Sequence, residues 1–260
     1  MALGKSFLVL TKKRVVKRAL WSPTECLGQT PPWGLALDLR LLQQINYMST
    51  LFSPDSKFLQ RFLSSGGYYD DDIDGDVGPK TREAIGKFEA DTEQVANELG
   101  SFDKRTESKV CTMLIPTQRK AREFMKNISQ GNVSQGLNVR IISGTRTYDE
   151  QDELFAQGRT KRGKVVTNAR GGFSNHNFGI AWDVGIFNEK GQYIDDLIDE
   201  GRMTSKAVDA EYKKVGAYGK SLGLFWGGDW TEPDYPHFQV RDNNELASIR
   251  NIFTDGGAIV

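Results

Sequence analysis

The charge balance of the 260-residue chain changes sign twice, and these changes constrain its organisation more than any other feature. Residues 1–34 carry six basic residues and one acidic residue, residues 35–100 carry 12 acidic and six basic residues, and residues 101–260 are almost neutral. A chain of this length suffices for one large domain or two modest ones. We therefore expect a basic segment at 1–34, a first domain at 35–95, a linker at 96–102 and a second domain at 103–260.

The overall composition excludes several classes of partner. The formal net charge is zero, so no bulk field draws the molecule to nucleic acid or anionic lipid. Apolar runs fall far short of the roughly 20 residues that cross a bilayer, so we expect no stable membrane insertion. In residues 1–34 most basic residues follow the short apolar stretch, unlike a signal peptide. A docking helix, an outer-membrane-disrupting arm and a disordered tail remain alternatives for this segment. Cys26 and Cys111 are too few for a disulfide framework and are expected to be ordinary thiols.

Hydrophobic periodicity predicts an α+β fold. Apolar residues at helical spacing predict helices at 58–63 and, after Gly78 and Pro79, through residue 88, with Thr81 as a possible cap and an acidic loop between them. The second domain alternates helices and strands, which predicts a small antiparallel sheet. Its helices are expected at 116–128, 149–157 and 206–222, and its strands at 139–143, 180–186 and 237–240.

The acidic loop at 70–76 partly matches a calcium-binding loop. Asp70, Asp72 and Asp74 alternate and precede Gly75, as in the opening of an EF-hand. The twelfth position, where a bidentate glutamate should close the coordination, is Thr81. Calcium binding and a solvated acidic turn therefore remain as alternatives to a third interpretation of this region.

The third interpretation is a family resemblance that covers residues 58–88. It rests on Leu59-Gln60-Arg61-Phe62-Leu63, Ile73-Asp74-Gly75, Gly78-Pro79-Lys80-Thr81 and the closing segment 84–88. This pattern resembles the small helical peptidoglycan-binding module of cell-wall hydrolases. The resemblance implies that Asp74, Gly75, Gly78 and Thr81 contribute to a shallow groove for wall glycan or stem peptide. The alternative is a helical hairpin that only packs on the main domain.

The chain has two histidines, and both lie beside predicted strands. His176 precedes Asp183 by seven residues, and His237 begins the last strand. Two imidazoles and one carboxylate that leave a fourth position open are typical of a catalytic zinc site, whereas structural zinc sites have four protein ligands. Non-haem iron uses the same ligand types, so it remains an alternative.

Metal-assisted hydrolysis also needs a base and an oxyanion stabiliser. Asp234 lies three residues before His237 across a turn that contains a proline, and Glu232 is a less well-spaced alternative. Arg146 follows the strand at 139–143, and Gln151 lies five residues further on, where it could face the same cleft. We therefore predict Asp234 as the base and Arg146 as the residue that holds the developing negative charge.

Taken together, these motifs resemble the LAS zinc metallopeptidases over residues 103–242. The residues that carry the resemblance are Ser143-Gly144-Thr145-Arg146-Thr147 with Gln151, Ser174-x-His176-x-x-Gly179-x-Ala181-x-Asp183, Trp226-Gly227-Gly228-Asp229-Trp230 and Asp234-x-x-His237-Phe238. Within this group the chain is similar to the L-alanyl-D-glutamate endopeptidases of bacteriophage endolysins and bacterial cell-wall enzymes. Aspartate at position 234, where the dipeptidase and D,D-carboxypeptidase branches typically carry glutamate, favours the endopeptidase branch.

The resemblance implies a bacteriolytic hydrolase that cleaves the L-Ala–D-Glu bond of peptidoglycan. His176, Asp183 and His237 would bind zinc, Asp234 would act as base and then acid, and Arg146 and Gln151 would complete the catalytic set. Ser174 and Trp230 would contact substrate. Independently of the resemblance, the acidic segment 188–205 follows the strand of Asp183, so we expect it to border the cleft. A D-Ala–D-Ala carboxypeptidase and a non-catalytic wall-binding or phage structural protein remain alternatives. We expect a monomer that stays in the host cytoplasm until a holin-type lesion releases it.

Overall fold

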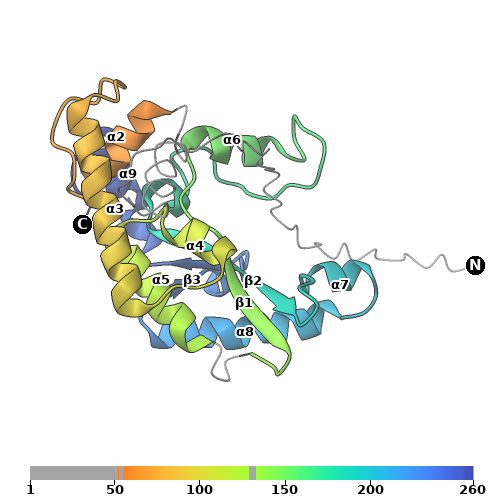
Figure 1. The fold of residues 1–260 in the computed structure, drawn as a ribbon. Helices are drawn as coiled ribbons and strands as arrows, with labels where there is room; N and C mark the ends of the chain where they lie inside the picture. Colours follow the sequence, from red (N-terminus) through yellow and green to blue (C-terminus); the bar gives the residue numbers. More distant parts are fainter. Residues whose placement is uncertain (1–51, 53–54, 129–132, 260) are drawn as a thin grey trace, which may run out of the picture.

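The computed structural model describes residue 52 and residues 55–128 and 133–259 (Figure 1). The basic segment 1–34 and residues 35–51 of the expected first domain, with Cys26, lie outside the described residues. None of the helices in the described part combines the length and the hydropathy that a membrane span requires. Cys111 is a free thiol, as the sequence predicts.

The centre of the molecule is a four-stranded antiparallel sheet with the strand order β1-β2-β4-β3. The strands are β1 (Leu137–Ser143), β2 (Ala181–Asn188), β3 (Phe225–Trp226) and β4 (His237–Gln239). The helical N-terminal part and this small sheet confirm the predicted α+β class. β2 pairs with β1 on one side and with β4 on the other, so it joins the two halves of the sheet.

One face of β2 supplies the main core. Trp182, Val184 and Ile186 alternate along the strand and pack in one buried cluster with side chains of the surrounding helices. These helices are α4 (Lys104–Val110), α5 (Ile115–Ile128) and α8 (Ser205–Ser221). Asp183 lies between two of the core residues in sequence, and the two-residue period of the strand turns its side chain to the opposite face.

The N-terminal helices build a second buried cluster together with the C-terminal helix. α2 (Ser56–Ser65), α3 (Pro79–Leu99) and α9 (Leu246–Thr254) lie together at one end of the molecule (Figure 1). Phe62 of α2 and Phe253 of α9 are both fully buried in this cluster, which also contains Phe178 from the segment that carries His176. The helical N-terminal part therefore shares a core with the rest of the chain. The proposed boundaries at residues 95 and 103 stay a prediction, and α3 extends to Leu99 within the predicted linker.

A buried glutamine organises the acidic loop between α2 and α3. The Gln60 side-chain amide donates to Asp74 Oδ1 at 2.7 Å, and its Oε1 accepts from the Gly75 backbone amide at 2.7 Å. The Asp74 carboxylate also accepts from the Asp76 backbone amide. Asp74 and Gly75 thus hold the loop closed by internal hydrogen bonds. Within the described residues, the acidic side chains of this loop do not form a cluster suited to a metal ion.

The prediction of Thr81 as a helix cap is wrong. Gly78 is the N-cap of α3 and Pro79 is its first residue, because proline has the helical φ angle and needs no amide partner there. Thr81 is the third residue of the helix and is buried, with its hydroxyl donating to the Asp76 carbonyl at 3.3 Å.

The prediction that segment 188–205 borders the cleft is also wrong. This segment follows the end of β2 that is distant from Asp183, and its short helix α7 (Asp196–Asp199) lies beyond that end (Figure 1). Asp195 is buried and accepts a hydrogen bond from the Tyr212 hydroxyl at 3.0 Å. Asp195 therefore lies against the main core, while the other acidic residues of this segment are exposed.

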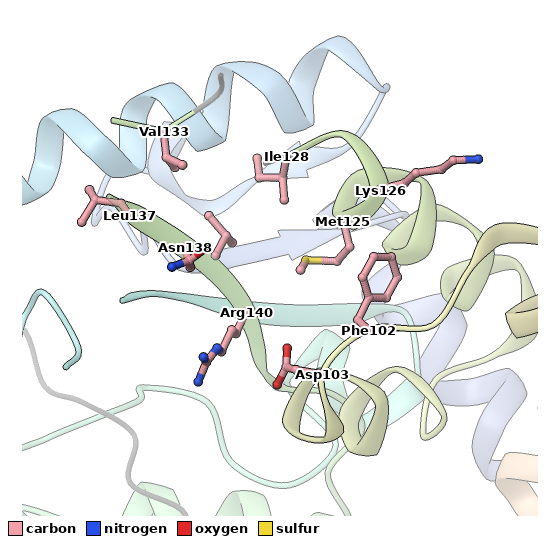
Figure 2. A pocket seen from close by; sticks show the side chains of 10 residues that line it. Phe102, Asp103, Met125, Lys126, Ile128, Val133, Leu137, Asn138 and Arg140 are labelled. Carbon is pink, nitrogen blue, oxygen red and sulfur yellow. The ribbon is translucent and has the colours of Figure 1, made fainter. Parts of the chain in front are cut away.

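A pocket with a volume of about 370 Å³ opens beside β1 and α5 (Figure 2). Apolar side chains such as Phe102, Met125 and Leu137 line it, together with Lys126 and Arg140. It lies toward the end of β1 that is far from Ser143, the residue that pairs with Asp183. The pocket is thus separate from the histidines.

Candidate metal centre

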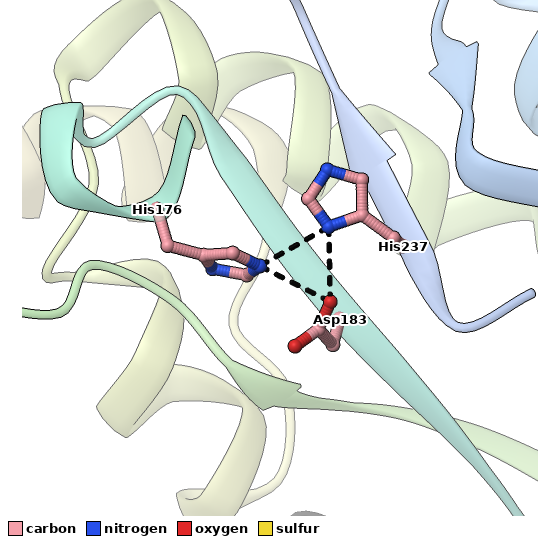
Figure 3. Close-up of side chains that lie close together, drawn as sticks. All are labelled: His176, Asp183 and His237. Carbon is pink, nitrogen blue, oxygen red and sulfur yellow. Dashed lines mark hydrogen bonds and ion pairs between the residues drawn. The ribbon is translucent and has the colours of Figure 1, made fainter. Parts of the chain in front are cut away.

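Three side chains of metal-ligating type converge on one buried point (Figure 3). Nε2 of His176 lies 3.1 Å from Asp183 Oδ1 and 3.2 Å from His237 Nδ1, and the latter lies 3.2 Å from Asp183 Oδ1. The exposed fractions of the three residues are 1%, 1% and 4%. The structure therefore brings together the three residues that the sequence selects as metal ligands.

Local structure explains this convergence. Asp183 and His237 are directly paired residues of β2 and β4, so their side chains share one face of the sheet. His176 lies on the short helix η1 (Asn175–Phe178), which Gly179 ends with a φ of 67°. This left-handed conformation favours glycine and turns the chain directly into β2.

The second ring nitrogen of His176 is held by the backbone. Nδ1 lies 2.8 Å from the Gly144 carbonyl, which can only accept a hydrogen bond, so Nδ1 carries the proton and Nε2 presents its lone pair to the cluster. A side chain at position 144 would meet the Lys109 carbonyl at 2.4 Å. Glycine is therefore required where the chain supports His176.

The three ligand atoms fit a metal ion. Tetrahedral zinc with bonds of about 2.0–2.1 Å separates its ligand atoms by roughly 3.3 Å, close to the 3.1–3.2 Å between these atoms. An acceptor carboxylate and the Nε2 lone pair of His176 face each other, and a cation between them satisfies both. Three protein ligands leave a position for water or substrate, as in catalytic sites.

Burial keeps His176 neutral, which predicts an acid-sensitive fold. Desolvation, together with the positive charge of Arg146, lowers the pKa of His176 from 6.5 to about 3. The unfolded chain binds this proton below pH 6.5, so the stability of the metal-free protein should fall as the pH drops from about 6.5 toward 3, by at most about 1.4 kcal/mol per pH unit from this group.

Urea unfolding of the metal-free protein at a series of pH values measures this effect. The His176→Gln variant is the comparison, since it cannot take up the proton. Equal slopes for the two proteins over this pH range would contradict the prediction.

Arg146 lies against the same cluster. Its Nη1 is 3.8 Å from Asp183 Oδ2, the carboxylate oxygen that is not shared with the histidines, and its exposed fraction is 9%. Burial lowers the pKa of Arg146, and the negative charges of Asp183, Asp234 and Glu150 oppose this change. Its Nε is buried without a hydrogen-bond partner in the described structure. The guanidinium therefore has donor capacity beside the cluster.

Asp234 lies on the turn that leads into β4. Its backbone amide donates to the Gly227 carbonyl at 2.9 Å, and its carbonyl accepts from the His237 amide at 3.1 Å. A side chain at position 227 would meet the Asp234 carbonyl at 2.6 Å, so glycine permits this close approach. Trp230 follows Gly227, and its ring centroid lies 5.0 Å from that of His237. This loop therefore places the Trp230 ring against His237 and ties the backbone of Asp234 to the start of β4.

Gln151 and Ser174 contact backbone segments next to the metal centre. The Gln151 amide donates to the Ala169 carbonyl at 2.9 Å and to Thr167 Oγ1 at 3.3 Å, so it anchors segment 167–169 beside the site. Ser174 is the N-cap of η1. Contacts of either residue with a substrate remain predictions.

Sequence reasoning missed Asn177, the amide that ties the Arg146 segment to the His176 segment. Its Nδ2 donates to the carbonyls of Arg146 and Thr147 at 2.9 and 3.2 Å, and its Oδ1 accepts from the Gly172 amide at 3.0 Å. Asn177 is fully buried one residue after His176. The sequence signal that could have identified it was an asparagine directly after a predicted ligand.

Two parts of the chain match known families. Residues 167–240 match the peptidase M15 model described as D-alanyl-D-alanine carboxypeptidase, and residues 53–93 match the model described as putative peptidoglycan binding domain. The first range includes the three clustered residues and Asp234. These matches confirm the predicted resemblance, in which a peptidoglycan-binding region precedes a peptidase region of the LAS type.

One relative of named activity and one solved structure are similar to parts of this chain. The peptidoglycan L-alanyl-D-glutamate endopeptidase CwlK of Bacillus subtilis (strain 168) is 42% identical over 111 residues, which are 42% of this chain and 65% of the relative. The match thus spans less than two thirds of that protein. The crystal structure of the Serratia marcescens L-Ala D-Glu endopeptidase ChiX aligns with 56% of this chain and 92% of its own, at 19% identity and a TM-score of 0.33.

Proposed function

We propose that the chain is a peptidoglycan hydrolase that cleaves the L-Ala–D-Glu bond of wall stem peptides. The buried His176, Asp183 and His237 cluster is the observation that carries this proposal. The 42% identity to an enzyme of that named activity, together with the peptidoglycan-binding match at 53–93, supports the choice of substrate.

Zinc is the proposed metal. Two imidazoles and one carboxylate at tetrahedral separations suit zinc, while iron shares these ligands and is the alternative. When bound, zinc lowers the pKa of water toward neutrality and polarises a carbonyl group. The protein supplies three ligands, which leave one position of the metal open, and the surrounding charges.

The residues around the cluster have complementary roles in the proposed mechanism. Asp234 accepts the proton of the attacking water and later delivers it to the leaving amine. The Arg146 guanidinium donates hydrogen bonds to the substrate carbonyl oxygen as negative charge develops there. Gln151 positions segment 167–169, and Trp230 forms a wall beside His237 that orients the stem peptide.

We also place the enzyme among bacteriophage endolysins with antimicrobial, wall-lysing action. In this proposal it acts as a monomer and reaches the wall from the host cytoplasm through a holin-type lesion. The resemblance of its motifs to endolysin peptidases supports this. Fractionation of cells that express it without a lesion tests the placement, since export of active protein would contradict it.

Mass spectrometry of digested sacculi tests the cleavage site. We expect new N-terminal D-Glu and free carboxyl groups on L-Ala, and we expect both to disappear after chelator treatment and return with zinc, because the attacking water depends on the metal. The Asp234→Asn variant is the second control.

The same digest discriminates the alternatives. Release of free D-Ala would indicate a D-Ala–D-Ala carboxypeptidase, the description carried by the family match at 167–240. Absence of zinc and of any cleavage would favour a non-catalytic wall-binding or phage structural protein.

A further inference from the structure

We propose that Gln239 is a positioning residue that fixes the proton of His237 on Nε2, so that Nδ1 presents its lone pair to the metal. This inference rests on the proposed metal site and assigns a role to a residue outside the ligand set. Gln239 lies two residues after His237 on β4, on the same face of the strand. Its exposed fraction is 1%.

The orientation of the Gln239 amide follows from its neighbours. Its Nε2 lies 2.7 Å from the Arg241 carbonyl and 2.9 Å from Asn243 Oδ1. The backbone carbonyl can only accept, so the NH₂ group of Gln239 must be on that side. Oε1 must then face His237, where it lies 2.9 Å from Nε2. Because this oxygen can only accept, Nε2 of His237 carries the proton.

Asn175 closes the network from the opposite segment. Its Nδ2 donates to Gln239 Oε1 and to Asn243 Oδ1, both at 2.8 Å. Asn175 is 4% exposed and directly precedes His176 on η1. The amides of Gln239, Asn175 and Asn243 thus connect the segments that carry the two histidines. Gln239 and Asn175 are buried, and hydrogen bonds between buried polar groups stabilise one arrangement.

The two histidines are therefore held in opposite tautomers. His176 is protonated on Nδ1 by its contact with the Gly144 carbonyl, whereas His237 is protonated on Nε2 by its contact with Gln239. Each ring directs its unprotonated nitrogen to the same point. A hydrogen-bond acceptor for the ring nitrogen that faces away from the metal raises the affinity of the site for the metal ion, because the histidine needs no change of tautomer when the metal binds.

Nitrogen NMR of the metal-free protein at pH 7 tests the tautomers directly. The chain has two histidines, so ¹⁵N-histidine labelling gives two imidazole patterns, which the His176→Gln variant assigns. We expect the Nδ1–H pattern for His176 and the Nε2–H pattern for His237. An Nδ1–H or mixed pattern for His237 would overturn the proposal, and this readout needs no change at Gln239.

Zinc affinity tests the consequence for metal binding. We expect Gln239→Met to weaken Zn²⁺ binding about 10–100-fold in competition with a fluorescent chelator, and to give a mixed His237 pattern. Gln118→Met is the matched control, since Gln118 is also fully buried and donates to the Met113 carbonyl in a different part of the fold. We expect this control to leave Zn²⁺ affinity unchanged.

The outcomes separate this inference from the proposed function. Equal Zn²⁺ affinity of the wild-type and Gln239→Met proteins would overturn the positioning role while the metal site stands. A wild-type protein that binds no Zn²⁺ would overturn the proposed function, and the His237 pattern would still decide the role of Gln239. Equal loss of affinity in both variants would assign the effect to general destabilisation and would also overturn the proposal.

Discussion

Replacing Asp234 with asparagine is expected to lower the rate of stem-peptide cleavage by about 10²–10⁴-fold, the usual contribution of a general base. Asparagine keeps the shape of the side chain but cannot accept the proton of the attacking water. The three clustered ligands do not include Asp234, so zinc content should stay at the wild-type level. The measurement is kcat on a defined muropeptide, with bound zinc determined on the same sample.

Glu232→Gln is the matched control for this prediction. Glu232 belongs to the same loop, is exposed, and accepts a hydrogen bond from Asn168 Nδ2 at 3.4 Å. Its substitution removes one negative charge from the loop without removing the proposed base, so we expect a rate close to wild type. A larger loss in Glu232→Gln than in Asp234→Asn would exchange the roles of the two acids, and loss of zinc from Asp234→Asn would make Asp234 a ligand.

The metal ligands could be predicted because few residues were available. The chain has only two histidines, while the choice of Asp183 among 34 acidic residues rested on its place in the motif after His176. The pairing of Asp183 with His237 in the sheet then brought the ligands together. Gln239 could have been found by the same reasoning, because residues two apart on a strand share a face. The Gly144 carbonyl could not have been found in this way, because a contact between a side chain and a backbone carbonyl 32 positions away depends on the tertiary approach of the two segments.

Sequence proximity misled the prediction for segment 188–205. This acidic stretch follows the strand of Asp183, but five further residues at about 3.3 Å each carry the chain to the opposite end of β2. The pattern of the sequence predicts that a strand exists and which face is buried. Where segment 188–205 lies relative to Asp183 depends on the direction of β2 in the assembled sheet.

Charge balance predicted two modules but gave no information about how they pack. The Phe62 ring of α2 lies directly on the turn that carries His176, since a Cβ at Gly179 would be 2.8 Å from its Cε2. The end of α2 also meets the C-terminus of the chain, where the Ile259 amide donates to the Ser65 carbonyl at 2.9 Å. The region that matches the peptidoglycan-binding model therefore packs against the turn beside His176 as part of one core.

This shared core predicts that a substitution in the region matched at 53–93 weakens the metal centre. Phe62 is fully buried and packs edge-on against Phe88 at 5.4 Å between ring centroids. Phe62→Ala is expected to lower the free energy of unfolding by about 3–5 kcal/mol, the usual cost of removing a buried aromatic ring. It should also weaken Zn²⁺ binding, because the Gly179 turn loses the surface on which it rests. Urea unfolding and chelator competition measure the two effects.

Phe225→Ala provides the comparison, because Phe225 is 41% exposed on β3 and its removal leaves no comparable cavity. We expect a small change in stability and an unchanged Zn²⁺ affinity for this variant. If Phe62→Ala is destabilised but binds Zn²⁺ as tightly as the wild type, α2 stabilises the fold without supporting the ligand geometry. If it is as stable as the wild type, the two regions are held together by contacts other than this ring, since the energy of the shared core would then lie elsewhere.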